Sequence, residues 1–184
     1  MDLAQNTMTR RTVHNYKPAK IADDHVIKAL ELSLWAPNHK LTYPWVYIWV
    51  GEQARLKLAD LSAELKAAKK ALSETELRAV RATVTNPSHL IAIGLRRNPD
   101  THRAHEDFAT LACGVQIACQ YLWEQGIGSK WTTGGWLTHP DSYAILGVSP
   151  EEVQLEGGLM IGVPSIIPAA TKRPPLERFL RRTE

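Results

Sequence analysis

The hydrophobic positions of the chain fall into two kinds of pattern, helical spacing and short continuous runs. After Asp23, apolar residues recur at helical intervals, which predicts a helix that ends before Pro37. Residues 45–50 (WVYIWV) and 90–95 (LIAIGL) are apolar almost without interruption, which is typical of buried strands. The chain therefore combines helices with strands.

The remaining segments continue this mixture. Residues 53–83 have a helical pattern interrupted by charges and alanines, which predicts two helices with a break between them. Residues 108–126 are apolar nearly all round, so the helix they form is expected to be largely buried. A short strand at 129–136, a helix at 140–147 and a last strand at 153–164 complete the prediction.

Composition and charge limit the kinds of protein that this chain can be. With 184 residues and 44% hydrophobic composition, residues 1–184 fit a single domain with one core. A formal net charge of +3 neither requires nor excludes a polyanionic partner. No apolar run approaches the roughly 18 residues of a membrane span, and the N-terminus lacks the hydrophobic region of a signal peptide. We therefore expect a cytoplasmic protein with no membrane partner.

The two cysteines, Cys113 and Cys119, lie six residues apart in one helical pattern. This spacing points them to different faces of the helix, which argues against a mutual disulfide and favours small buried side chains. His39 has no cysteine cluster or second histidine at metal-ligand spacing, so no metal site is expected.

Four motifs follow one another along the chain: TRRTVHNY, APNHKLTYPW, QGIGSKWTTG and GVPSIIPAATKRPPLERF. In order and spacing they resemble the FMN-dependent nitroreductase family over nearly the whole chain. The resemblance implies an α+β fold with a central, mostly antiparallel β-sheet flanked by helices, built as an intertwined homodimer with FMN at the interface. It also implies that residues 167–184 are a C-terminal extension that packs on the partner subunit.

The first and last motifs supply the cations of the implied FMN site. By resemblance, Arg10, Arg11 and Thr12 grip the cofactor and Arg173 contacts its phosphate, with Lys172 as a second charge. Guanidinium groups suit a phosphate because they combine charge with paired donors. For Arg10 and Arg11, the alternative interpretation is a solvated basic turn.

His14 lies where the family commonly has a fixed positive charge, near N1 and the C2 oxygen of the flavin. A histidine titrates near neutrality, so we expect the flavin potential to depend on pH through this residue. A turn histidine facing water is the alternative.

The second motif is implied to reach FMN, often from the neighbouring subunit, through Pro37, Asn38 and His39. For His39, the alternative is a hydrogen bond within the loop. Two later positions depart from the family, because Leu41 and Tyr43 stand where amide side chains are usual.

In the third motif, Trp131, Thr132 and Thr133 resemble the segment whose backbone amides meet the flavin near N5. Such backbone contacts make these residues binding elements rather than acids or bases, and Gly134 permits a close turn.

The resemblance implies that hydride passes from NADH or NADPH through FMN to a small-molecule acceptor, a nitroaromatic or a quinone. No catalytic side chain is expected, since the flavin carries the chemistry. No nucleic-acid partner is expected, although a non-enzymatic binder of an acidic partner remains an alternative. The other alternative is a flavoprotein of the same superfamily with a different reaction, such as a dehydrogenase or a flavin-processing enzyme.

Overall fold

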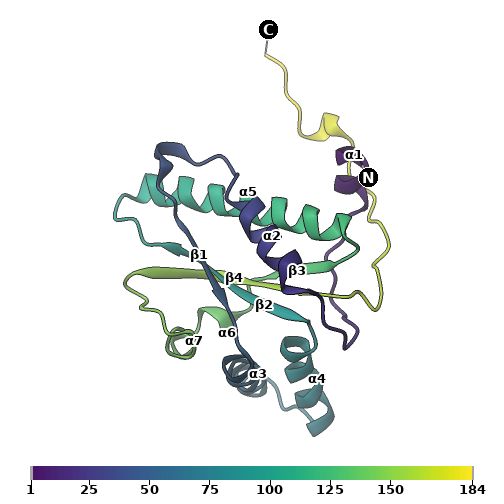
Figure 1. The fold of residues 1–184 in the computed structure, drawn as a ribbon, viewed down its shortest axis with the longest axis vertical. Coiled ribbons are helices and arrows are strands. Elements are labelled where there is room, and N and C mark those ends of the chain that lie inside the picture. Colours follow the sequence, from purple (N-terminus) through teal and green to yellow (C-terminus); the bar gives the residue numbers. More distant parts are fainter. Residues whose placement is uncertain (1, 184) are drawn as a thin grey trace.

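The computed structural model describes residues 2–183, which form a four-stranded sheet between two layers of helices (Figure 1). The strand order is β1-β2-β4-β3, and all three neighbouring pairs are antiparallel. The strands are β1 (Trp45–Trp49), β2 (His89–Arg96), β3 (Gly128–Thr132) and β4 (Val153–Gly162). This arrangement confirms the α+β fold with a central antiparallel sheet.

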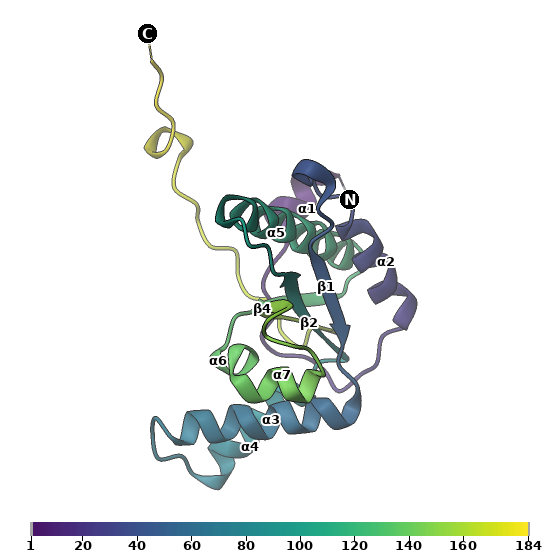
Figure 2. The same ribbon diagram turned by 90° about the vertical axis from the view of Figure 1, so that its left-hand side faces the viewer.

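Helices α2 (Asp23–Ser33) and α5 (Thr101–Glu124) cover one face of the sheet, as Figure 1 and Figure 2 show. The opposite face is covered by α3 (Glu52–Ala67), α4 (Glu74–Thr85), α6 (Gly135–Thr138) and α7 (Pro140–Leu146). The shorter elements are α1 (Leu3–Thr9), beside the end of α5, and the 3₁₀ turns η1 (His39–Leu41) and η2 (Leu176–Arg178).

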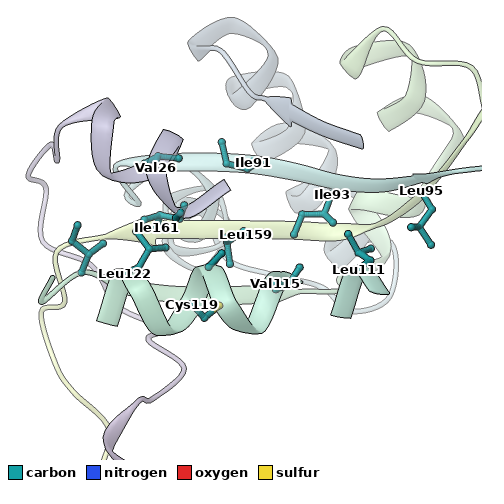
Figure 3. Close-up of a cluster of buried hydrophobic side chains, with 13 residues drawn as sticks. Val26, Ile91, Ile93, Leu95, Leu111, Val115, Cys119, Leu122, Leu159 and Ile161 are labelled. Carbon is teal, nitrogen blue, oxygen red and sulfur yellow. The ribbon is translucent and has the colours of Figure 1, made fainter. Parts of the chain in front are cut away.

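The main core lies between the central strands and α5 (Figure 3). Ile91 and Ile93 from β2 and Leu159 and Ile161 from β4 belong to one buried cluster with Leu111, Val115 and Leu122 of α5, and Ile91 lies beside Val26 of α2. Burying each such side chain contributes roughly 1.5–3 kcal/mol. The two central strands are therefore the most firmly held part of the molecule.

Most of the expected elements are present, and three expectations need correction. The strand expected at 129–136 ends at Thr132, and Gly135–Thr138 form helix α6 instead. Residues 45–50 do not form a buried strand, because β1 is an edge strand whose residues are half-buried or exposed. The helix expected at 108–126 starts seven residues earlier, at Thr101, because Asp100 accepts hydrogen bonds from the first backbone amides. That helix buries only one face, since the sheet covers it from one side.

The outer face of α5 carries side chains that the sequence placed in the core. Phe108 is 40% exposed, and Cys113 is exposed rather than buried. Cys119, on the inner face, is buried as expected, and both cysteines are free.

Helix α1 was not anticipated from the sequence. It is capped by Asp2, which accepts a hydrogen bond from the amide of Gln5, and it is anchored to the end of α5. There the Asn6 amide donates to the Gln120 carbonyl, and the Gln120 amide donates to the Thr7 hydroxyl. These contacts place the following arginines beside α5 and β3.

Candidate functional site

The arginine pair of the first motif follows directly on α1. Thr12 then forms a bridge with Ser129 of β3, where the Val13 amide donates to the Ser129 carbonyl at 3.1 Å, and Tyr16 forms a bridge with Pro164 after β4. Val13 is fully buried, and Tyr16 closes the segment by donating its hydroxyl proton to the Val13 carbonyl. The buried Val13 and Tyr16 therefore fix the positions of Arg10 and Arg11.

A cavity of about 440 Å³, the arginine cavity, joins this motif to the C-terminal tail. Its lining residues are Thr7, Met8, Arg10, Arg11, Ala170, Thr171 and Arg173. The structure thus brings two adjacent arginines near the start of the chain together with Arg173, more than 160 positions away. No acidic residue is among the described residues that line it, so the cavity favours an anion.

The three guanidinium groups of this cavity are not equivalent. Arg11 donates to the carbonyl oxygens of Met8 and Arg10, each at 2.7 Å, so it stabilises the end of α1. Within residues 2–183, the guanidinium groups of Arg10 and Arg173 make no hydrogen bond or ion pair. They remain available to an anionic ligand.

Thr12 and His14 lie on the exposed side of the same segment. Thr12 forms a bridge with Ser129 of β3, and its side chain is exposed. His14 is also exposed and borders a smaller hollow of about 190 Å³ together with α4 residues such as Thr83. His14 therefore does not line the arginine cavity.

A second cavity of about 470 Å³, the lysine cavity, lies on the α3 side of β3. Lys66 at the end of α3, Lys69 just beyond it and Lys130 on β3 line this cavity. Because side chains alternate along a strand, Lys130 and Thr132 point to the same face, and Gly134 and Gly135 close the rim.

Electrostatics at this cavity favour a negatively charged ligand group. Burial lowers the pKa of Lys130 below its usual value, and the charge of Lys66 lowers it further. The described residues lining the lysine cavity include no carboxylate that could balance these charges. An anionic group placed there would therefore be stabilised by both lysines.

The sequence analysis missed these lysines. For Lys66 and Lys69 the only signal is the KAAKK run, which looks the same as an ordinary solvated helix end, while Lys130 lies within the third motif without being singled out there. Only the position of β3 beside that helix distinguishes them from other surface lysines.

The third motif is divided between the two faces of the sheet. Thr132 and Gly134 line the lysine cavity. Trp131 instead packs against the α5 layer, and its indole donates to the Glu156 carbonyl at 3.3 Å. Thr133 is exposed and is absent from the described lining residues of that cavity.

The second motif forms a loop that is fastened to α5. Thr110 donates to the Pro37 carbonyl at 2.9 Å, and the Thr42 hydroxyl donates to the carboxylate of buried Asp107. The side chain of Asn38 makes its hydrogen bonds within the loop. Its amide nitrogen donates to the Thr42 hydroxyl, and its oxygen accepts from the backbone amide of Tyr43. Pro37 and Asn38 thus have structural roles in this chain.

His39 is the loop residue that carries a titratable partner. Its Nδ1 lies 2.9 Å and 3.0 Å from the two carboxylate oxygens of Glu106 on α5. The hydrogen bond from His39 is the main reason that the pKa of Glu106 lies below its usual value. Neither residue lines the arginine or the lysine cavity within the described chain.

Apolar side chains are exposed around this loop. Trp35 is 84% exposed, Leu41 64% and Tyr43 58%, which is unusual for large apolar side chains clustered in sequence. Farther along the chain, the tail exposes Ile166, Ile167, Leu176 and Phe179. In Figure 1 and Figure 2 the tail extends away from the body of the molecule.

A family model described as the nitroreductase family matches residues 7–163, which include the first arginine motif, the loop and the whole sheet. The chain belongs to the nitroreductase family. Membership confirms the resemblance on which the site residues were selected, although the match ends before the tail that contains Arg173.

Relatives and solved structures agree with this membership. The chain is 25% identical over 174 residues to a Bacillus subtilis (strain 168) protein named "Putative NAD(P)H nitroreductase YfhC", covering 93% of this chain and 89% of that protein. A nitroreductase-like family protein from Bacillus cereus superposes with a TM-score of 0.86 at 24% identity, over 100% of this chain and 97% of the other.

A third similar protein was solved with the nicotinamide cofactor NADPH bound. It is the FMN-dependent nitroreductase NfnB from Mycobacterium smegmatis in complex with NADPH, with a TM-score of 0.75 and 18% identity over 100% of both chains. At this identity, the similarity shows the nitroreductase fold alone.

The donor set of the two cavities fits an FMN molecule. The arginine cavity offers guanidinium groups for a phosphate dianion, and the lysine cavity offers ammonium groups and a glycine-lined rim for a flat ring. Thr12 forms a bridge with Ser129, the residue before Lys130, so the segment that follows the arginines meets the strand that lines the lysine cavity. Among the described residues, no group of His, Cys, Asp and Glu could hold a metal ion, and no helix is long and apolar enough to cross a membrane.

Proposed function

We propose that this protein is an FMN-dependent NAD(P)H oxidoreductase that reduces a nitroaromatic, quinone or related small-molecule acceptor. The observation that carries the proposal is the convergence of unpaired cations from distant parts of the chain on two cavities beside β3, in a nitroreductase fold. Relatives with nitroreductase and NADPH in their names support the nicotinamide as electron donor.

When bound, FMN accepts hydride from a reduced nicotinamide and passes it to the acceptor. The chain contributes binding and electrostatics to this reaction. Arg10 and Arg173 would neutralise the phosphate, and Thr132 and Gly134 would lie against the ring. Lys130 and Lys66 would stabilise the negative charge that the ring gains on reduction.

We further propose that the active unit is a homodimer. The exposed apolar side chains Trp35, Leu41 and Tyr43 and the outer face of α5 with Phe108 would be covered by a second copy. Residues 167–184 would pack on that partner, because their exposed Leu176 and Phe179 find no apolar surface in their own chain.

The test is an absorbance spectrum of the purified protein with added FMN, followed by anaerobic addition of NADH and, separately, NADPH. Bound flavin that bleaches with either nicotinamide, and recovers when a quinone or nitroaromatic is added, is the expected result. If flavin binds but neither nicotinamide bleaches it, a different flavoprotein reaction replaces the proposal. If FMN does not bind, the cations serve another anion, and binding of an acidic partner that weakens steeply with salt becomes the better explanation.

A further inference from the structure

Helix α3 forms one wall of the lysine cavity. Ser62, Leu65, Lys66 and, just after the helix, Lys69 line the cavity. Their spacing of three and four residues places them in one stripe along a single face of the helix. This stripe runs from Ser62, which is 2% exposed, to the exposed Lys69. It therefore combines a buried polar group at one end with a solvated cation at the other.

Two hydrogen-bond donors that line this cavity have no partner in the described chain. The Ser62 hydroxyl makes no hydrogen bond within residues 2–183, although the residue is almost fully buried. The indole N–H of Trp136, a residue that is 9% exposed, makes none there either. Its nitrogen lies at the glycine rim, since a Cβ on Gly134 would be 2.8 Å from it. Buried donors are normally paired, so a ligand with oxygen acceptors would satisfy both.

The cations of this cavity outnumber the charge that FMN would bring to it. Among residues 2–183, the ammonium groups of Lys66, Lys69 and Lys130 form no ion pair. The phosphate of the proposed FMN would lie in the arginine cavity, and the flavin ring is neutral when oxidised and gains at most one negative charge on reduction. Positive charge therefore remains on the α3 side of the lysine cavity and favours a second anion.

The shape and the apolar lining narrow the class of this second ligand. Leu65, Trp136 and Met160 give the cavity apolar surface, and Met160 is 4% exposed. Along the helix, Ser62 and Lys69 are about 10 Å apart, at a rise of about 1.5 Å per residue. A ligand that matches this arrangement has a flat apolar body, neutral oxygen acceptors at one end and a negative charge at the other. A nitro-substituted aromatic carboxylate has these features.

We infer that the acceptor is a nitroaromatic carboxylate whose carboxylate pairs with Lys69 and whose nitro oxygens accept hydrogen bonds from Ser62 and Trp136. The inference rests on the proposed function, because it needs an acceptor that is reduced through FMN. Lys69 is then a specificity-determining residue, which favours the acid over neutral nitroaromatics. Ser62 is the residue that fixes which end of the molecule lies deep in the cavity.

The carboxylate takes no part in the redox step. Hydride supplies two electrons and one proton to the nitro group, and a second proton comes from water. One N–O bond of the nitro group breaks, a water molecule leaves, and a nitroso group remains.

The first experiment measures reoxidation of the reduced protein by anaerobic stopped flow, with para-nitrobenzoate and with its neutral methyl ester. The ratio of the two rate constants is compared between variants, because this cancels the different intrinsic reactivity of acid and ester. In Lys69→Met the ratio of acid to ester should fall about fivefold, the upper end for an exposed ion pair, and raised salt should lower it in wild type. Lys70→Met, the neighbouring position outside the described lining, should keep the wild-type ratio.

The second experiment measures binding without any reaction. The oxidised, FMN-loaded protein is titrated calorimetrically with para-nitrobenzoate and with benzoate, which lacks the nitro group. Ser62→Ala, a substitution that suits a helix interior, should weaken para-nitrobenzoate about fivefold and leave benzoate unchanged. Lys69→Met should weaken both ligands, and Lys70→Met neither.

The outcomes separate this inference from the proposed function. If the acid-to-ester ratio is the same in wild type and Lys69→Met while a nicotinamide still bleaches the flavin, the inference fails and the proposed function stands. If Lys69→Met instead slows bleaching by NADPH but not by NADH and keeps the ratio, Lys69 serves the phosphate of the electron donor and the inference is overturned. If neither nicotinamide bleaches the wild-type protein, the proposed function fails and the inference about its acceptor fails with it.

Discussion

At the scale of single residues, the site is defined by cations that lack carboxylate partners. Arg81 shows the ordinary situation, because its guanidinium pairs with Asp60 at 2.7 Å on the exposed surface. Arg10, Arg173 and Lys130 have no such partner in the described chain. Unbalanced charge of this kind costs stability unless a ligand supplies the opposite charge.

Replacing Arg10 or Arg173 with alanine should weaken FMN binding. A hydrogen bond to a charged group contributes about 1.5–3 kcal/mol, so the Kd should rise roughly tenfold to a hundredfold for each variant. Titration of FMN fluorescence measures this change. Arg81→Ala is the control and should bind FMN as wild type does. An unchanged Kd in both variants would mean that the arginine cavity does not hold the phosphate.

Lys130→Met should affect stability and redox potential in opposite directions. Burial lowers the pKa of Lys130 in the folded state, so the charged form destabilises the apoprotein at neutral pH. That penalty is lost as the pH rises from the folded pKa through the unfolded value of about 10.4. The variant should therefore melt higher than wild type at pH 7, and the difference should shrink in alkaline solution.

With FMN bound, Lys130→Met should make the flavin harder to reduce, because a positive charge near the reduced ring is lost. A more negative midpoint potential, measured against reference dyes, is the expected result. Lys57→Met, an exposed position on α3 outside the described lysine-cavity lining, should change neither the melting temperature nor the potential. Equal potentials in wild type and Lys130→Met would place the ring elsewhere.

At the scale of elements, the end of β3 depends on a glycine in β4. The register between β2 and β4 shifts between Ile93 and Gly94, and nearby Gly157 has a φ of +134°. A Cβ at Gly157 would collide with the Thr132 carbonyl oxygen and lie 3.0 Å from the Trp131 indole nitrogen. This irregular point of β4 thus allows β3 to lie close at the rim of the lysine cavity.

Gly157→Ala should destabilise the protein by about 2 kcal/mol or more, because the residue must adopt an unfavourable φ and displace Thr132. The affinity for FMN should fall as well, since displacing Thr132 also shifts Gly134, and both residues line the lysine cavity. Urea unfolding and flavin titration measure the two effects. Gly51→Ala is the matched control, because a Cβ there meets nothing within 4 Å. A wild-type urea midpoint in Gly157→Ala would contradict this account of β4.

At the scale of the whole molecule, the tail and the loop expose large apolar side chains that stay uncovered within residues 2–183. The tail reaches the arginine cavity at Arg173 and then leaves the body of the molecule (Figure 1). Its Leu176 and Phe179 are large, exposed apolar side chains, which are typical of a protein interface rather than of a solvated chain end. A second copy is the occupant that we propose for these surfaces.

Sedimentation at micromolar concentration should show a dimer for the full chain. Removal of residues 169–184 should weaken dimerisation and lower FMN affinity together, because it deletes both the apolar arm and Arg173. Arg173→Ala is the companion variant and should lower FMN affinity while leaving the dimer intact. A monomeric full-length protein would refute the shared-site arrangement.

Much of the element order could be predicted from the chain, since a period of two or 3.6 residues records which side of an element is buried. The predictions for β2 and for the break between α3 and α4 are confirmed. The sequence analysis did not anticipate α1, because its stability depends on contacts with Gln120 and not on its own pattern. The burial expected for Cys113 was wrong, because an apolar helix face does not reveal whether a neighbour covers it.

The family and the α+β class were determined by the sequence alone, because the motifs are local and keep their order along the chain. The binding roles of Arg10 and Arg173 stay predictions from the same motifs. The tertiary structure decided which residues, distant in sequence, lie next to one another. It placed Lys66 near Lys130, turned Trp131 away from the cavity and paired His39 with Glu106. These are relations between residues far apart in sequence, and they depend on how helices pack on the sheet, which no local pattern records.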